Sequence, residues 1–281
     1  MLDLKTLRET LFRTAYQMLG EVEDAEDVVQ EVLVDLSQKI ATDKVAAIEN
    51  LNGYYVRATV YKSINYLKIK KRSEYPGVWL PEPYIFPSHL EHSGLDVSFG
   101  FVHLLSKLNP NERAVFILRE SFEMSFKEIA MDLPFTEANC RKLYQRSKEK
   151  IQHKAPLNVV DQHKKEALTQ QFLHSVRTGD MEALLQLLVE EITIYSDGGG
   201  KVAAATVPIQ GVERCIKFLL GIQKQASSNI RVEIKNSESN ILILLYEASA
   251  SEPYTVVVLD ASEDKIRTIY LQRNPDKLKF L

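Results

Sequence analysis

The chain has 281 residues, of which 45% are hydrophobic and 26% charged, and its formal net charge at pH 7 is −3. This composition is typical of a soluble globular protein, and the length allows two or three domains. The longest strongly apolar run, residues 241–246, is far too short to span a bilayer, so no membrane partner is expected.

Charge is segregated along the chain. Residues 21–35 contain seven acidic residues and no lysine or arginine, whereas residues 57–72 contain six basic residues and no acid. Residues 141–154 carry six basic residues against a single glutamate. This distribution predicts one acidic surface for a basic partner and two separate basic surfaces for nucleic acid.

The N-terminus lacks the charged and apolar blocks of a signal peptide. The two cysteines, Cys140 and Cys215, lie on apolar helical faces far apart in the sequence, so we interpret them as small core residues. Both observations predict a cytoplasmic protein in a reducing compartment.

Residues 1–72 have a helical pattern. A first amphipathic helix runs to Gly20, and a second carries an apolar stripe opposite an acidic stripe of Asp24, Asp27, Glu31 and Asp35. A solvated face is one interpretation of the acidic stripe. Because four acids without interleaved lysines repel one another, we favour docking to a partner.

A third helix is expected after Gly53, and it interleaves tyrosines with lysines and arginines. Aromatic rings between cations suit stacking on unpaired bases while the phosphates are neutralised. The alternative is that some of these tyrosines belong to the core. The sequence does not decide which face each ring takes.

Residues 73–100 are interrupted by prolines and glycines and are predicted to be a linker. The linker contains the only tryptophan of the chain, in a stiff extended segment formed by Trp79, Leu80, Pro81, Glu82 and Pro83. An exposed tryptophan there would be prone to nonspecific contacts, so we expect Trp79 to dock into a pocket.

Residues 101–155 predict a helix-turn-helix. Asn109, Pro110 and Glu112 have the spacing of a capping box with proline at the first helical position, and Ser125 and Glu128 repeat the box. A last helix opening at Thr136 has one small apolar face and a basic, amide-bearing front. An ordinary basic surface helix is the alternative, but the consecutive capping boxes and short turn favour DNA recognition.

Residues 160–281 change to an α+β pattern. Helices are expected near 161–177 and 181–189, strands at 191–196 and 201–206, and a helix after Gly211. Four β-rich runs follow, at 230–235, 240–248, 254–260 and 265–272. This order predicts a curved antiparallel sheet that wraps around helices.

The order of these features resembles an extracytoplasmic-function (ECF) sigma factor, the bacterial subunit that directs RNA polymerase to promoters. Residues 13–20 (RTAYQMLG) and 24–31 (DAEDVVQE) are similar to the polymerase-clamp-binding segment of that family. Residues 108–116 (LNPNERAVF) resemble the opening of its C-terminal promoter domain, and 128–130 (EIA) and 137–141 (EANCR) resemble its helix-turn-helix.

The resemblance implies that the chain is multidomain, with two all-α sigma domains, the second containing the helix-turn-helix. The implied boundaries are 1–72 for sigma region 2, 73–100 for the linker and 101–155 for sigma region 4. The implied partners are core RNA polymerase, through its clamp helices and flap, and promoter DNA.

The resemblance also implies a role for individual residues. The residues implied to bind polymerase are Asp24, Asp27, Gln30 and Glu31. The minus-ten element is contacted by Arg57, Tyr61, Lys62, Asn65, Lys68, Lys70, Lys71 and Arg72. The minus-thirty-five element is contacted by Thr136, Asn139, Arg141, Lys142, Gln145, Arg146 and Lys148. Pro134 stands where the turn commonly has glycine and Tyr61 where many relatives have asparagine, so the promoter sequence is not predicted.

Three segments look like the ECF subgroup with a fused C-terminal SnoaL-like domain, here an α+β cone over residues 160–281. The first is the linker segment around Trp79 described above. The other two are Asp197, Gly198, Gly199, Gly200 and Lys201, and Asn274, Pro275, Asp276, Lys277 and Leu278. In that subgroup the resemblance implies that the fused domain modulates sigma activity in cis. We expect the triple glycine to let a partner segment, such as the linker, approach closely.

An enzymatic role for the C-terminal domain is not expected. No histidine follows His174, so the sheet offers no His–Asp pair and no histidine-containing metal set, and no cofactor or metal is predicted. The alternative function is a SnoaL-type ligand-binding or catalytic protein with an ancillary DNA-binding helix-turn-helix. An unidentified ligand or protein partner at this domain, and the oligomeric state, stay open.

Overall fold

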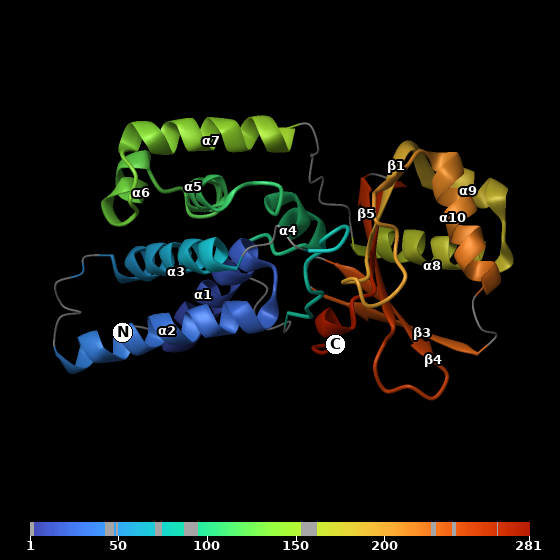
Figure 1. The fold of residues 1–281 in the computed structure, drawn as a ribbon, viewed down its shortest axis with the longest axis horizontal. Coiled ribbons are helices and arrows are strands. Elements are labelled where there is room, and N and C mark those ends of the chain that lie inside the picture. Colours follow the sequence, from blue (N-terminus) through green and yellow to red (C-terminus); the bar gives the residue numbers. More distant parts are fainter. Residues whose placement is uncertain are drawn as a thin grey trace. The chain divides into compact units, whose positions relative to one another are not determined.

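The computed structural model describes residues 3–42, 48, 50–70, 75–86, 95–152, 162–225, 229–237, 240–262 and 264–281. The chain divides into two compact units (Figure 1). The helical unit comprises Met1–Ser73 and His89–Ala155, and the sheet unit comprises Glu74–Ser88 and Pro156–Leu281. The predicted linker is therefore divided, and its first half belongs to the sheet unit. None of the described helices is long and apolar enough to cross a membrane.

The helical unit begins with α1 (Leu4–Leu19), α2 (Val22–Ala41) and α3 (Leu51–Ile69). The side chain of Asp3 caps α1, and Gly20, with a φ of 72°, ends it as predicted. Helix α3 begins at Leu51, two residues before Gly53, because the side chain of Asn50 accepts a hydrogen bond from the Gly53 amide. Apolar side chains with at most 2% exposure, such as Leu11, form the core between these three helices.

The second part of this unit contains α4 (Phe99–Leu105), α5 (Pro110–Glu120), α6 (Phe126–Asp132) and α7 (Glu137–Gln152). Both predicted capping boxes are present, at the starts of α5 and α6. The hydroxyl of Thr136 accepts a hydrogen bond from the Asn139 amide, so Thr136 opens α7. The predicted apolar face of α7 is buried: Cys140 and Ser147 are fully buried, and Leu143 and Ile151 are 8% exposed.

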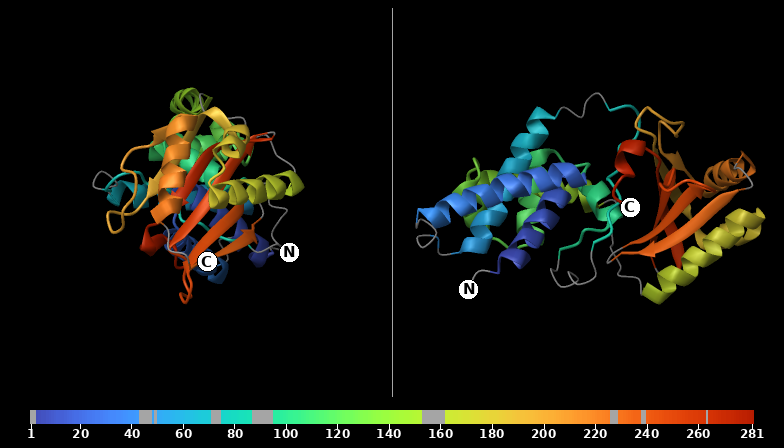
Figure 2. Two further views of the ribbon diagram at one scale, coloured as in Figure 1. Left: turned by 90° about the vertical axis from the view of Figure 1, so that its right-hand side faces the viewer. Right: turned by 90° about the horizontal axis from the view of Figure 1, so that it is seen from below.

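The sheet unit contains α8 (Gln162–Thr178), α9 (Met181–Leu187) and α10 (Val212–Gln225). Its strands are β1 (Leu188–Asp197), β2 (Ile209–Gln210), β3 (Ile230–Asn236), β4 (Ile241–Glu247), β5 (Thr255–Ser262) and β6 (Lys265–Gln272). They form one sheet in the order β2-β1-β6-β5-β4-β3. The helices pack on one face of this sheet, as Figure 2 shows.

Two details of the predicted sheet are wrong. Residues 201–206 form turns and bends instead of a strand, and β1 pairs with the short β2. The three alanines of this stretch have low β-propensity and offer little side chain to pack on a sheet. In addition, β1 pairs with β6 in parallel, so the sheet is mixed, whereas the pairs β3–β4, β4–β5 and β5–β6 are antiparallel as predicted.

Candidate polymerase, promoter and regulatory surfaces

The exposed face of α2 carries three of the four residues predicted to bind polymerase. Asp27, Gln30 and Glu31 are exposed, while Val28, Val29 and Val32 on the opposite face are buried. The helix therefore has the two-sided burial that its sequence predicts. Its acidic face is open to a partner.

The fourth residue, Asp24, is turned inward, with only 9% exposure. Its carboxylate accepts hydrogen bonds from the Tyr66 hydroxyl and from Lys70 Nζ, at 2.6 Å for the latter. Lys70 Nζ also donates to Glu21 at 2.6 Å. Burial and the hydrogen bond to Asp24 raise the pKa of Tyr66 to about 12. These contacts tie α3 to the start of α2, so Asp24 positions the acidic face instead of belonging to it.

The predicted minus-ten residues of α3 are not all on one surface. Tyr61 is 41% exposed, Lys68 is exposed and Asn65 is half-buried. Lys62 donates to Glu31 at 2.8 Å, which places a predicted DNA residue beside a predicted polymerase residue. Arg57 is only 8% exposed and pairs with Asp132 of α6. Lys71 and Arg72 lie outside the described residues.

The front of α7 presents the predicted minus-thirty-five residues together. Six of them are exposed and Lys148 is half-buried: Thr136, Asn139, Arg141, Lys142, Gln145 and Arg146. The back of the helix is fixed by its apolar residues and by Lys150, whose ammonium donates to both carboxylate oxygens of Glu112 at 2.7 and 2.8 Å. A rigidly held helix with a basic outer face has the geometry that major-groove recognition requires.

Aromatic side chains brace α6 against its neighbours. The ring of Phe126 lies beside the guanidinium groups of Arg119 and Arg141, at 5.2 and 5.0 Å. Tyr144 packs against Phe126 and donates its hydroxyl to Glu120. Burial and this hydrogen bond raise the pKa of Tyr144 to about 12. Tyr144 thus joins α7 to the end of α5 and to the start of α6.

In the sheet unit, the carboxylate of Asp197 at the end of β1 is fully buried and receives the linker. The Tyr75 hydroxyl donates to Asp197 Oδ1 at 2.6 Å, and the Leu80 amide donates to Asp197 Oδ2 at 2.9 Å. Gln272, the last residue of β6, donates to the carbonyl oxygens of Leu80 and Pro81. The structure therefore places the linker segment directly on the sequence motif that begins at Asp197.

Lys277, from the third predicted motif, completes this network. Its ammonium donates to Asp197 Oδ2 at 3.0 Å and to the Leu80 carbonyl at 2.7 Å, and it is 5% exposed. The same ammonium lies 4.5 Å from the ring of Trp79 and 4.7 Å from that of Tyr75. A buried charge is tolerated when it is paired and hydrogen-bonded, which is the case here. We call these residues the Asp197 network: Tyr75, Trp79, Leu80, Asp197, Gln272 and Lys277.

The triple glycine allows a close approach, as expected. A Cβ on Gly199, which has a φ of 59°, would lie 2.4–2.6 Å from side-chain atoms of Asn274. A Cβ on Gly200, with a φ of 72°, would lie 2.6 Å from Pro76 of the linker. Both positions therefore require glycine for backbone conformation and for space. Lys201 and Asp276 form an exposed ion pair beside this turn, at 2.6 Å.

The linker segment extends across the sheet beyond the Asp197 network. The Phe86 amide donates at 3.3 Å to the hydroxyl of Ser237, which follows β3 at the far edge of the sheet. Leu80 is fully buried, Phe86 is 4% exposed and Glu82 is 4% exposed. The segment is thus part of the core of the sheet unit.

Among the residues of these surfaces that were not predicted are Tyr75, Gln272 and Asp132. Tyr75 precedes Pro76 in the linker, and this position is the only feature of the nearby sequence that could have indicated its role. Gln272 and Asp132 end a strand and a helix, and nothing near them in the sequence indicates their partners.

Comparison with known proteins agrees with this geometry. Residues 100–151 match the family model for sigma-70, region 4. The chain is 27% identical over 233 residues to the ECF RNA polymerase sigma factor SigJ of Mycobacterium tuberculosis (strain ATCC 25618 / H37Rv), covering 78% of this chain and 72% of SigJ. It is 25% identical over 189 residues to the probable ECF RNA polymerase sigma factor SigI of Mycobacterium tuberculosis (strain CDC 1551 / Oshkosh), covering 64% of each.

The chain is similar in sequence to ECF sigma factors. Its fold agrees with the crystal structure of the Mycobacterium tuberculosis extracytoplasmic function sigma factor SigJ, with a TM-score of 0.76 at 22% identity, covering 98% of this chain and 96% of that one. Helices α4–α7 lie in the stretch that matches sigma-70, region 4, and the sheet unit is an additional α+β domain.

Proposed function

We propose that this chain is an ECF sigma factor that binds core RNA polymerase and directs it to specific promoters. The observation that carries the proposal is the outer face of α7, where Arg141, Lys142, Gln145 and Arg146 are exposed on a helix whose back is buried. Arginine or lysine on this face can address guanine and glutamine can address adenine in the minus-thirty-five major groove.

Polymerase binding is assigned to the exposed acidic face of α2, with Asp27, Gln30 and Glu31 against the clamp helices, and with region 4 against the flap. The ion pair between Lys62 and Glu31 is exposed, with side-chain exposures of 35% and 66%, so exchanging it for a contact with polymerase costs little. The chain acts in the cytoplasm, where its polymerase partner is found.

Promoter opening is assigned to α3, where Tyr61 is exposed beside Asn65 and Lys68. Stacking of an unpaired base on the Tyr61 ring contributes affinity that does not depend on the DNA sequence. Hydrogen bonds to base edges contribute the sequence specificity. The DNA phosphates are bound by Lys68, Lys70, Lys71, Arg72 and Lys148.

Regulation in cis is assigned to the sheet unit. The linker joins the two promoter-binding halves of the chain, and its Trp79 segment is held by the Asp197 network. Any partner that loosens this network changes how freely the two halves move. Aliphatic side chains, such as Ile194, Ile243 and Leu271, fill the space between the sheet and its helices. This packing favours a protein-docking role over ligand binding.

We infer that the sheet unit is not a catalyst. Both carboxylate oxygens of Asp197 accept hydrogen bonds from protein groups, so this buried acid is not free to act as a general base. Among the described residues, no cluster of three or more histidine, cysteine, aspartate or glutamate side chains could hold a metal ion.

The test is core binding by a variant with Asp27→Lys and Glu31→Lys. Reversing two charges on an exposed face should abolish association with core polymerase, while substitutions there seldom change stability much. The matched control is Glu190→Lys with Glu191→Lys, two exposed acids of β1. If the α2 variant keeps its circular dichroism and its core affinity, the acidic face is only solvated.

A second experiment addresses DNA. The net charge of −3 and the division of the basic residues between α3 and α7 predict weak promoter binding by the free chain. Gel shifts at physiological salt should show specific binding only with core polymerase. Tight, sequence-specific binding by the free chain would contradict the proposal.

A further inference from the structure

In the helical unit, α3 and α6 are joined by one ion pair. Arg57 Nε lies 2.5 Å from Asp132 Oδ2, and Asp132 is the last residue of α6. The Arg57 side chain is 10% exposed and that of Asp132 is 35% exposed. An arginine from a basic helix is thus withdrawn from solvent by an acid of the helix-turn-helix.

Two further contacts join the same parts of this unit. The guanidinium of Arg113, on α5, donates to the Met18 carbonyl in the last turn of α1 and to the Leu108 carbonyl. The Gln17 amide of α1 donates to the Asp96 carbonyl at 2.8 Å. Arg113 is 3% exposed and Gln17 is fully buried, so these contacts are buried while the pair of Arg57 and Asp132 reaches the surface.

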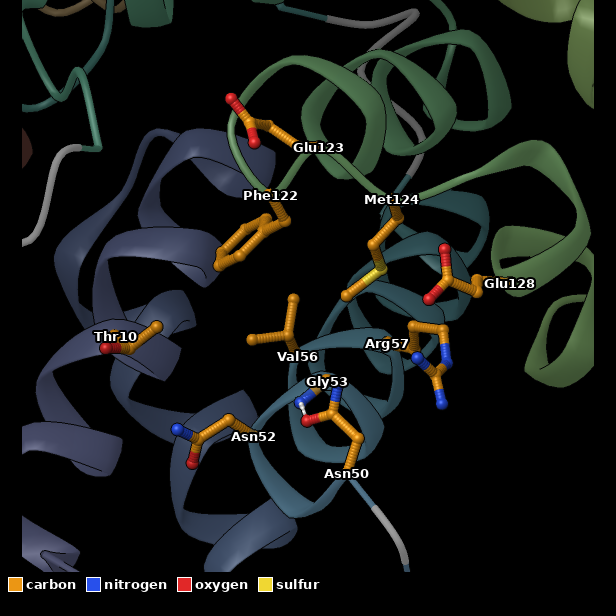
Figure 3. Close-up of a pocket in the computed structure, with 10 residues that line it drawn as sticks. All are labelled: Thr10, Asn50, Asn52, Gly53, Val56, Arg57, Phe122, Glu123, Met124 and Glu128. Atoms are coloured by element: carbon orange, nitrogen blue, oxygen red, sulfur yellow. Dashed lines mark hydrogen bonds between the residues drawn. The ribbon is translucent and has the colours of Figure 1, made fainter.

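Beside this ion pair the two parts do not meet completely. A cavity of about 330 Å³ separates α3 from the loop between α5 and α6. Figure 3 shows Val56 on one side of it and Phe122 and Met124 on the other, with Arg57 and Glu128 at its rim. Val56 and Met124 are buried, at 1% and 8% exposure, so the two parts meet around the cavity without filling it.

We propose that the pair of Arg57 and Asp132 is a latch that holds the free sigma factor closed and keeps Arg57 from DNA. Separating α3 from α6 at this edge breaks this ion pair, loosens the packing of α3 against α5 and α6, and widens a cavity that is already present. The consequence for DNA rests on the proposed function, since only a sigma factor uses Arg57 on a promoter. The closure itself does not depend on that function.

The strength of the latch follows from its exposure. A pair with one partially exposed member contributes modestly, so removing it should shift the ratio of open to closed molecules by about two- to fivefold. If only the open form binds polymerase, the apparent core affinity should rise by at most the same factor. The pair should also weaken as salt is added.

The test is energy transfer between dyes in the full-length chain, on Ser37→Cys of α2 and Glu149→Cys of α7. Both positions are exposed, whereas Cys140 and Cys215 are buried and do not compete for label. Asp132→Asn keeps the side-chain shape and should shift transfer to a more open distribution. Glu23→Gln, which removes an exposed acid of the same unit, is the control and should change nothing.

A double-mutant cycle identifies the pair. Arg57→Gln should open the chain as Asp132→Asn does, and the double variant should be no more open than either single one. Transfer in the unsubstituted chain should fall with added salt, and that in Asp132→Asn should respond less. Unchanged transfer in Asp132→Asn, or additive effects of the two substitutions, would overturn the latch.

Core binding by the same proteins separates the two proposals. Opened variants with unchanged folding but no affinity for polymerase would refute the sigma-factor function and leave the latch standing. If the Asp132→Asn variant binds polymerase normally and its energy transfer is unchanged, the latch is refuted and the sigma-factor function stands.

Discussion

Asp197→Ala removes the acceptor at the centre of the Asp197 network, and we expect it to release the linker segment from the sheet. The carboxylate is fully buried and accepts hydrogen bonds from Tyr75, Leu80 and Lys277. Without it, the ammonium of Lys277 would lose its 3.0 Å ion pair in a site where it is only 5% exposed.

The magnitude follows from that uncompensated charge. Removing one partner of a buried ion pair costs about 3–5 kcal/mol, because the other charge stays desolvated. Lys277 keeps the Leu80 carbonyl at 2.7 Å and the rings of Tyr75 and Trp79, so we expect a loss near the lower end of this range. Adding Lys277→Met removes the stranded charge and should restore at least half of the loss.

The assay is urea unfolding followed by the fluorescence of Trp79, the only tryptophan of the chain. Because its ring lies 4.5 Å from Lys277 Nζ, its emission reports directly on this contact. The control is Asp276→Asn, which breaks the exposed pair with Lys201, whose side chains are 55% and 52% exposed. An exposed pair contributes at most about 1 kcal/mol.

Two outcomes would refute this reasoning. If Asp197→Ala is no more destabilising than Asp276→Asn, the buried carboxylate does not hold the linker. If Lys277→Met deepens the loss caused by Asp197→Ala, the two residues do not act as a charge pair.

Three further predictions address other parts of the molecule. Lys142→Ala with Gln145→Ala should reduce discrimination among minus-thirty-five sequences by about 1–3 kcal/mol per lost base contact, measured by transcription from a promoter panel; equal losses on every promoter would show that these side chains do not read bases. Trp79→Ala should change transcription at unchanged core affinity and make the linker more sensitive to protease, and unchanged digestion would contradict docking. Glu123→Gly should raise the free energy of unfolding by about 0.5–1 kcal/mol, because Glu123 adopts a φ of 54° that glycine tolerates better; a lowered thermal midpoint would contradict this.

Much of the local structure was predictable because helix ends are decided by neighbouring residues. The boxes at Asn109 and Ser125 join side chains to amides three residues away, and Thr136 opens α7 in the same manner. The basic front of α7 was also predictable, because the 3.6-residue period assigns one face to the core and leaves the other to solvent.

The acidic and basic stripes were predicted only in part. Periodicity places Asp24 and Asp27 on the same side of α2, yet Asp24 is buried against Tyr66 and Lys70 while Asp27 is exposed. Arg57 shows the same limit, because its partner Asp132 lies 75 positions away on another helix. A helical period says which residues share a face, but not what packs on it.

Sequence alone was enough to predict the helices of the first unit other than α4, the helix-turn-helix, the antiparallel run β3–β6 and the three motifs around Trp79, Asp197 and Lys277. All of these depend on hydrophobic period, capping or turn residues that act over a few positions. Three contacts could be seen only in the folded molecule: β1 pairs in parallel with β6, Arg57 pairs with Asp132, and one buried carboxylate joins the linker to the sheet. These contacts link residues up to 122 positions apart, and their energy comes from desolvated groups whose partners exist only once the chain has folded.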